Sequence, residues 1–184
     1  MMEHIPITPK ALGIPESIRL PKRKDWGIGI VGFGSIAQHA HAPSYQRVGW
    51  AIAAVADPDP NAQQIAREKF GVQHIYADYR ELIVDDAVEV IDLCTQPTLR
   101  EDVVLSAATA GKHIITEKPF GPTIEACLRM VKAADEARIK LAVHQNYRWM
   151  KMNYLAYHII NRGFIGVPFF ASIAIFGRQD VSLA

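Results

Sequence analysis

The chain has 184 residues, of which 49% are hydrophobic and 21% charged, with a net charge of +1. These values are typical of one globular domain with room for part of a second. They give no electrostatic basis for binding nucleic acid, and no apolar run approaches the ~20 residues of a membrane span. Cys94 and Cys127 form no metal or redox spacing, which favours a reduced, cytoplasmic location. Residues 1–25 contain four prolines and no sustained period, which predicts an extended N-terminal arm.

A glycine-rich turn follows the first apolar run, and two frames of the dinucleotide fingerprint fit it. The first frame uses Gly27, Gly29 and Gly32, but its preceding segment is basic and begins with proline, unlike a buried strand. The second uses Gly32, Gly34 and Ala37 and is preceded by apolar, β-branched residues. We therefore adopt the second frame, in which the turn joins a strand to a helix.

In this frame each position has a physical task. Gly32 makes the tight turn, and Gly34 lets the backbone approach a pyrophosphate. Ser35 stands where a helix N-cap or first-turn residue is wanted. The backbone N–H groups around Phe33, Gly34, Ser35 and Ile36 would receive the phosphates.

An acid, Asp57, ends the next apolar run, about where the fingerprint expects a carboxylate for the ribose hydroxyls of NAD. Its charge would repel the extra phosphate of NADP, so NAD is favoured over NADP. Asp57 also suits the N-cap of the Asp-Pro-Asp-Pro turn, and the two roles are compatible.

Strands and helices alternate along the chain, which predicts an α/β fold with a doubly wound parallel sheet in a domain covering residues 26–149. Pro43 is expected to kink the first helix. His39 and His41 lie two apart and share no helix face, so no metal site is predicted. Strands are expected at 26–31, 50–56, 74–76, 88–94, 113–116 and 140–144, and helices at 35–48, 61–70, 79–84, 98–110 and 123–137.

The character of the sequence changes after residue 144. A helix is expected at 153–161, and a β-type run at 168–177 is apolar on both faces. Because a single strand cannot form a stable layer, residues 150–184 are interpreted as a linker helix and the first strand of a mostly missing α+β domain. We expect the natural product to be longer, or a separate chain to complete this second sheet.

Ligands of doubly wound sheets bind beyond the carboxyl ends of the strands. With the strand order 3-2-1-4-5-6, the loops Thr95-Gln96-Pro97 and Glu117-Lys118-Pro119 would converge on the glycine turn. Lys118 would then lie near the nicotinamide as a proton donor or acceptor. A surface lysine paired with Glu117 is the structural alternative.

With these motifs in order, the chain resembles the glucose–fructose oxidoreductase and inositol dehydrogenase family (Gfo/Idh/MocA) over about residues 26–177. The resemblance implies a Rossmann-type domain that binds NAD or NADP, followed by an α+β domain for the substrate. It implies that Lys118, in the Glu-Lys-Pro triplet, assists proton transfer. The stretch 143–149 looks like the family's cleft-lining segment, which adds Gln145 to the cofactor residues and makes Asn146 and Arg148 substrate-cleft candidates.

Two departures from the family pattern stand out. Thr98 and Arg100 are near the places where many members have asparagine and histidine, so cofactor contacts in that loop are expected to differ. The family's Asp…His pair of the second domain has no counterpart after residue 177, so the catalytic set is incomplete in this chain.

The resemblance implies hydride transfer between a nicotinamide and a carbinol carbon of a sugar, cyclitol or related polyol. It also implies a homo-oligomer formed through the second-domain sheet. Two rival interpretations remain: a non-catalytic dinucleotide-binding or regulatory module, and a reductase of the same fold that acts on an imine or enone.

Overall fold

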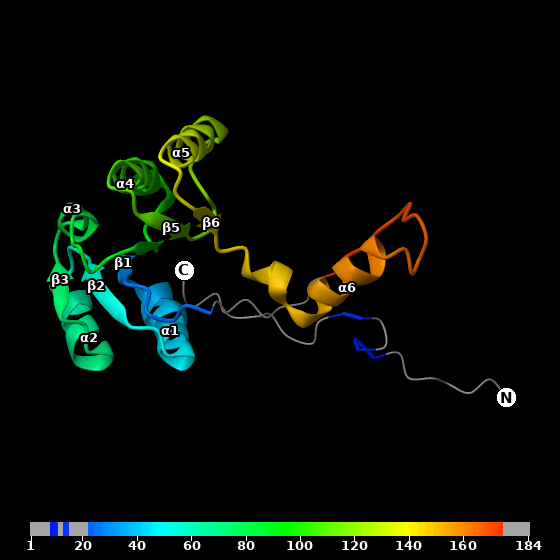
Figure 1. The fold of residues 1–184 in the computed structure, drawn as a ribbon, viewed down its shortest axis with the longest axis horizontal. Coiled ribbons are helices and arrows are strands. Elements are labelled where there is room, and N and C mark those ends of the chain that lie inside the picture. The colour runs from blue at the N-terminus through cyan, green and yellow to red at the C-terminus, as the bar shows by residue number, and fades with distance from the viewer. Residues whose placement is uncertain (1–7, 11–12, 15–21, 175–184) are drawn as a thin grey trace. The chain divides into compact units, whose positions relative to one another are not determined.

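The computed structural model describes residues 8–10, 13–14 and 22–174. The chain divides into two compact units, Leu20–Gln145 and a second made of Met1–Arg19 with Asn146–Ala184 (Figure 1). Each unit is described by itself. Among the described residues, no helix is both long and apolar enough to cross a bilayer.

The first unit is built on a six-stranded, all-parallel sheet. Its order, β3-β2-β1-β4-β5-β6, confirms the predicted doubly wound topology. The strands are β1 (Ile28–Val31), β2 (Ile52–Ala56), β3 (His74–Tyr76), β4 (Val90–Leu93), β5 (His113–Thr116) and β6 (Leu141–Val143).

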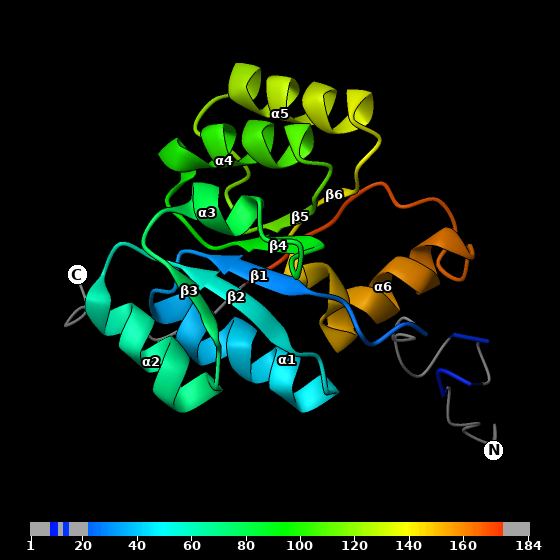
Figure 2. The same cartoon turned by 60° about the vertical axis from the view of Figure 1, so that its left-hand side comes forward.

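Helices cover both faces of the sheet. Figure 2 shows α3, α4 and α5 on one face and α1 and α2 on the other. Their bounds are α1 (Ala42–Val48), preceded by a π-helical turn η1 (Ala37–His41), α2 (Pro60–Phe70), α3 (Tyr79–Ile83), α4 (Pro97–Thr109) and α5 (Ile124–Glu136).

Local chemistry accounts for the helix ends. Asp59 caps α2 by accepting from the N–H of Asn61, and Gly71 ends it in the left-handed region at φ 71°. Thr123 caps α5 by accepting from the N–H of Ala126.

The expected effect of Pro43 takes a specific form. Pro43 lies at the start of α1, and η1 precedes it with the N–H of Ala42 bonded to the carbonyl of Ala37. Because proline lacks an N–H, the chain widens into a π-helical turn before it. This turn ends at His41, which is buried.

Strand alternation sends side chains to two separate cores. Ile91 and Leu93 of β4 belong to the core that also holds Val103 and Met130 from α4 and α5. Val90 packs with the opposite core, beneath α1 and α2. Asp92 therefore faces α1, because successive residues of a strand alternate faces.

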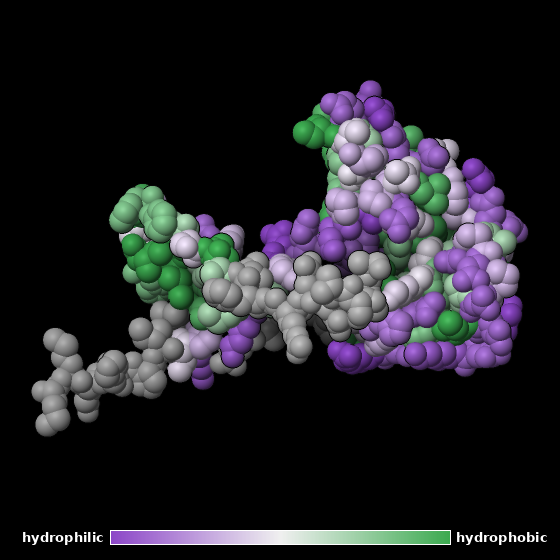
Figure 3. Space-filling model, turned by 180° about the vertical axis from the view of Figure 1, so that it is seen from behind, coloured by the Kyte–Doolittle hydropathy of each residue, from purple (hydrophilic) through white to green (hydrophobic). Residues whose placement is uncertain are grey.

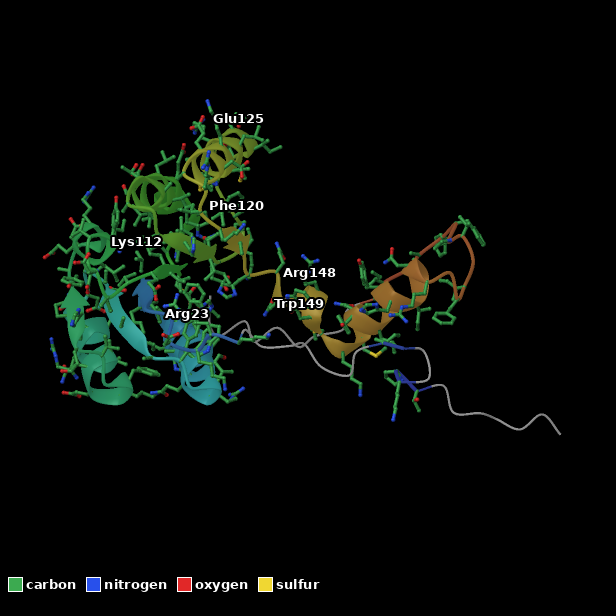
Figure 4. All side chains as sticks on the ribbon, viewed as in Figure 1. Arg23, Lys112, Phe120, Glu125, Arg148 and Trp149 are labelled. Atoms are coloured by element: carbon green, nitrogen blue, oxygen red, sulfur yellow. The ribbon has the colours of Figure 1, made fainter. Side chains whose placement is uncertain are left out.

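Two charged side chains secure the amino end of the sheet (Figure 4). Arg23, at the end of the expected arm, pairs with Glu89 at 2.8 Å and lies 4.0 Å from the ring centre of Trp26. Lys112 donates from Nζ to the carbonyls of Asp85 and Val88. The described residues of 8–25 form no helix or strand.

Within its described residues, the second unit holds a 3₁₀ turn, η2 (Asn146–Trp149), and the helix α6 (Lys151–Asn161), which begins two residues before the predicted position. Large apolar side chains of this unit lie exposed, among them Phe164, Val167 and Phe169. Figure 3 shows hydrophobic surface, in green, on both parts of the chain.

The predicted strand at 168–177 is not formed in residues 168–174, which have no regular structure. Residues 175–177 lie outside the described part of the chain. A strand is held by hydrogen bonds to a neighbouring strand, and within the described residues this unit contains none. The assignment of 150–184 to a second domain stays a prediction.

Candidate cofactor site at the carboxyl edge of the sheet

The carboxyl ends of the strands are joined into one continuous edge. The residue after each strand except β3 donates its N–H to the last residue of the neighbouring strand, including Asp57 to Tyr76 at 3.1 Å, which brings the predicted loops together as expected. The other bonds are Gly32 to Ala56 (2.8 Å), Cys94 to Val31 (2.8 Å), Glu117 to Leu93 (2.9 Å) and His144 to Thr116 (2.8 Å).

The glycine turn follows β1, which confirms the frame of Gly32 and Gly34. Gly32 has φ +85°, and a Cβ there would lie 3.0 Å from Cγ2 of Thr95. A Cβ on Gly34 would meet nothing within 4 Å, so this residue faces open space. Ser35 and Ile36 then open the helix, whose first N–H groups have no acceptor inside the helix.

Phe33 anchors the glycine turn, whereas the N–H groups of its neighbours are predicted to bind phosphate. Its ring is fully buried and lies edge-on to Phe70, with ring centres 5.5 Å apart. Its N–H donates to Oδ2 of Asp57 at 2.6 Å. Phe33 therefore anchors the turn to the core and to β2 rather than presenting its N–H to a phosphate.

Asp57 directly follows β2, as the fingerprint requires. Oδ2 accepts from Phe33 and Oδ1 accepts from the N–H of Asp59 at 2.9 Å, so the carboxylate fixes both the glycine turn and the next turn. Asp57 also opens the Asp-Pro-Asp-Pro turn, as the alternative expects, but the N-cap of α2 is Asp59. A carboxylate oxygen can accept more than one hydrogen bond, so Asp57 retains capacity for ribose hydroxyls.

The loop after β4 contains an unsatisfied group. Oγ1 of Thr95 is the one buried side-chain oxygen without a hydrogen-bond partner within the described part of the chain. Gln96 is the N-cap of α4 without a side-chain cap bond, and Pro97 begins the helix. A buried hydroxyl without a partner is costly, and a bound ligand would supply one.

Arg100 does not point toward the open edge. It is 3% exposed, and its guanidinium donates to the carbonyls of Thr95, Glu117 and Pro119. Burial lowers the pKa of Arg100, while the charge of Glu117 opposes this shift. Arg100 thus clamps the loop after β4 to the loop after β5, which the sequence pattern did not predict.

Lys118 is exposed at this edge and precedes a cis proline, Pro119. Its N–H donates to Oε2 of Glu117 at 3.0 Å. No ion pair between the side chains of Lys118 and Glu117 is formed in the described structure. The Glu117 carboxylate instead turns inward, toward His41.

A buried polar cluster lies beneath these loops, and sequence reasoning missed it. Asp92 is 0% exposed and receives bonds from four side chains: His41 Nδ1 at 2.7 Å, the hydroxyl of Tyr45 at 2.8 Å, His144 Nε2 at 3.3 Å and the Cys94 thiol at 3.6 Å. An aspartate inside the apolar run of β4 was the available signal, since a buried carboxylate requires partners.

The electrostatics of the cluster follow from this bonding. Burial opposes ionisation of Asp92, but His144 and His41 outweigh it and lower the pKa to about 2. Burial and then Asp92 raise the pKa values of Tyr45 and Cys94, which keeps both protonated. Ligand-type atoms of His41, Asp92 and His144 lie within 4.8 Å of one another, and hydrogen bonds already account for this closeness.

The remaining candidates are distributed over both units. Gln145 follows β6 in the first unit and is exposed, with its N–H bonded to the carbonyl of Val143 at 2.7 Å. Asn146 and Arg148 belong to the second unit, where the guanidinium of Arg148 lies 5.0 Å from the Trp149 ring centre (Figure 4). Their role in a substrate cleft stays a prediction.

Taken together, the edge fits a dinucleotide. It offers open space at Gly34, helix-start N–H groups for phosphates, a carboxylate at Asp57 and an orphaned hydroxyl at Thr95. Lys118 adds an exposed cation near the end of β5.

Comparisons with known proteins agree with this geometry. Residues 26–145 match the family described as an oxidoreductase family with an NAD-binding Rossmann fold (GFO_IDH_MocA). Levoglucosan dehydrogenase of Pseudarthrobacter phenanthrenivorans is 32% identical over 148 residues, covering 76% of this chain and 38% of that protein. Myo-inositol 2-dehydrogenase of Thermotoga maritima is 29% identical, covering 77% and 42%.

A solved structure extends the likeness to three dimensions. The WlbA dehydrogenase from Bordetella pertussis, in complex with NADH and UDP-GlcNAcA, has a TM-score of 0.72 and 26% identity, covering 77% of this chain and 42% of that chain. The chain thus spans about 40% of the length of its relatives. It belongs to the Gfo/Idh/MocA oxidoreductase family, and residues 26–145 form its NAD-binding Rossmann fold.

Proposed function

We propose that this chain is the cofactor-binding part of an NAD-dependent dehydrogenase that transfers hydride between the nicotinamide and a carbinol carbon of a sugar, cyclitol or related polyol. The observation that carries the proposal is the carboxyl edge, where the open Gly34 position, Asp57 and the orphaned Thr95 hydroxyl meet. The named relatives act on levoglucosan and myo-inositol, which favours this substrate class.

The bound nicotinamide would supply the hydride chemistry, and the residues of this chain would hold it. The N–H groups of Gly34, Ser35 and Ile36 would bind the pyrophosphate, and Asp57 the adenosine ribose. Thr95, Gln96 and Pro97, with Glu117 and Gln145, would line the nicotinamide side. NAD is preferred over NADP because the carboxylate of Asp57 repels a ribose phosphate.

Lys118 is proposed as the catalytic residue. Its backbone is held by the Glu117 carboxylate and by the Arg100 clamp, so the ammonium extends from a fixed loop. From there it would hold or deliver the proton of the substrate hydroxyl while hydride leaves the carbon. Asn146 and Arg148 are proposed to contact the substrate.

Cofactor binding is tested by Gly34→Val. Because nothing lies within 4 Å of the Cβ position, the variant should fold with the stability of the wild type. The added side chain would occupy the pyrophosphate's approach, so calorimetric NAD affinity should fall by at least ~10-fold, about 1.4 kcal/mol. Unchanged NAD affinity in a folded Gly34→Val protein would contradict the site.

Catalysis is tested in the natural gene product by Lys118→Ala, with Lys132→Ala as the charge-matched control on an exposed face of α5. Lys118→Ala should lower kcat by roughly 10²–10⁴-fold with NAD affinity nearly intact. A kcat within about twofold of wild type would favour a non-catalytic dinucleotide-binding module instead.

Assembly and location are further proposals. The exposed apolar residues of the second unit support the proposed homo-oligomer, which sedimentation of the natural product would test. A cytoplasmic location is proposed from the two cysteines, both of which are free thiols.

A further inference from the structure

His41 stands between two carboxylates inside the protein. Its Nδ1 lies 2.7 Å from Oδ2 of Asp92, and its Nε2 lies 3.2 Å from Oε1 of Glu117. The side chains are 7%, 0% and 13% exposed, so water cannot readily replace either contact. An ionised carboxylate only accepts hydrogen bonds, so both contacts require a hydrogen on each ring nitrogen.

We propose that His41 is a buried imidazolium that positions Glu117 and, through it, the Lys118 loop at the cofactor site. The role of this loop in binding rests on the proposed function, whereas the charge of His41 does not. A neutral ring would direct a nitrogen lone pair at one carboxylate, which a buried site cannot tolerate cheaply.

Every element packed against His41 is compatible with this charge. Tyr45 from α1 and Cys94 after β4 remain neutral and donate to Asp92, and His144 after β6 contacts the same carboxylate. Burial alone would lower the pKa of His41, but the hydrogen bonds and charges of Asp92 and Glu117 outweigh it and raise the pKa.

Each carboxylate of the cluster has a cationic neighbour in the cluster or in the clamp above it. Asp92 and Glu117 contribute two negative charges, and His41 and Arg100 contribute two positive charges. Arg100 reaches the Glu117 backbone carbonyl, which brings its charge close to this carboxylate. Buried charges are rarely stable unless they are paired in this way.

The consequence for the loop is a fixed carboxylate. Oε1 of Glu117 is held by His41, and Oε2 accepts from the N–H of Lys118 at 3.0 Å. Both oxygens are therefore engaged, and the first residue of the Glu-Lys-Pro triplet cannot turn toward Lys118 Nζ. Loss of the proton on Nε2 of His41 would free Oε1 of Glu117 and loosen the triplet.

The first test measures the ring directly, without cofactor. In ¹⁵N-labelled protein at pH 7, both ring nitrogens of His41 should show the shifts of protonated nitrogens, and the titration midpoint should exceed that of free histidine. Asp92→Asn should lower this midpoint. A neutral His41 tautomer at pH 7 would overturn the proposal, whether or not the protein binds NAD.

The second test separates positioning from mere stability. His41→Gln should alter the Lys118 amide signal and weaken NAD by about 10-fold, and it should flatten the fall of NAD affinity as pH rises through the His41 midpoint. His74→Gln is the control, since His74 also pairs with an aspartate, Asp85, but is 49% exposed on β3.

Two results would contradict this role. One is an NAD affinity with the same pH dependence in wild type and His41→Gln. The other is stoichiometric Zn²⁺ binding that is lost in both His41→Gln and His144→Gln, because a metal would displace the proton from the ring. If NAD fails to bind wild type at all, the proposed function fails, while the ring measurement still decides the charge.

Discussion

Replacement of Arg100 by leucine would remove the clamp between the loops after β4 and β5. The side chain is 3% exposed and satisfies the carbonyls of Thr95, Glu117 and Pro119. Hydrogen bonds that involve a charged group contribute about 1.5–3 kcal/mol each. The variant no longer buries a charge, which offsets part of this loss.

The net loss expected for Arg100→Leu is about 3 kcal/mol of unfolding free energy. Urea unfolding has a slope of roughly 1–3 kcal/mol per molar for small domains, so the midpoint should fall by at least ~1 M with an unchanged slope. The unfolding transition can be followed by circular dichroism on the chain itself. NAD affinity should fall as well, because both loops border the proposed site.

Arg129→Leu is the matched control. Arg129 pairs with Glu101 on the surface, with a side chain that is 57% exposed, so its loss should cost at most about 1 kcal/mol. Arg100→Lys should be less stable than wild type, with a midpoint between those of wild type and Arg100→Leu or close to that of Arg100→Leu. One ammonium cannot reach three carbonyls in the geometry of a guanidinium. Equal midpoints for Arg100→Leu and Arg129→Leu would refute the clamp.

Three further outcomes are expected. NAD should bind more tightly than NADP in calorimetry, and Asp57→Ala should narrow the difference in affinity by weakening the binding of NAD. Tighter binding of NADP by wild type would show that Asp57 only forms the turn. Because the pKa of Asp92 is lowered to about 2, its stabilisation is present above pH 4 and lost as the pH falls from about 4 to about 2. The urea midpoint of wild type should fall over this pH range, and that of Asp92→Asn should fall less. Equal falls in the two proteins would contradict a stabilising role of the Asp92 carboxylate. Gly29→Ala should strongly lower the stability of the fold, because the new Cβ would lie 2.8 Å from Cγ1 of Val88. Gly34→Ala should unfold at the wild-type urea midpoint, because nothing lies within 4 Å of its Cβ position. Similar midpoints for the two variants would be inconsistent with this packing.

The fold was predictable because its signals are local. Strand runs, the glycine turn and caps such as Thr123 and Gly71 each lie within a few residues, and their alternation selects the parallel sheet. The frame of Gly32 followed from the apolar residues directly before it. The strands expected at 74–76 and 113–116 have the predicted bounds, whereas the other four were predicted one to two residues too long at one or both ends.

The inner layer of the site was not predictable from spacing. His41 is 51 positions before Asp92 and 76 positions before Glu117 in the sequence. Only the strand order and register bring the three side chains into contact. The presence of Arg100 was interpreted as a sign that cofactor contacts in this loop differ from those of the family. Its position on α4 instead buries the guanidinium, where it bonds to backbone carbonyls. The strand expected at 168–177 failed in residues 168–174 because β propensity without a partner strand does not form a ladder.

The central claim is that NAD binds along the carboxyl edge of this sheet. Titration of the ¹⁵N-labelled chain with NAD, followed by amide shifts, tests it most directly. We predict saturable shifts at Gly34, Ser35, Thr95 and Lys118, with the amides of Gly71 and Gly111, at the far ends of α2 and α4, unchanged. The absence of saturable shifts at the edge, or shifts confined to residues away from it, would contradict the account.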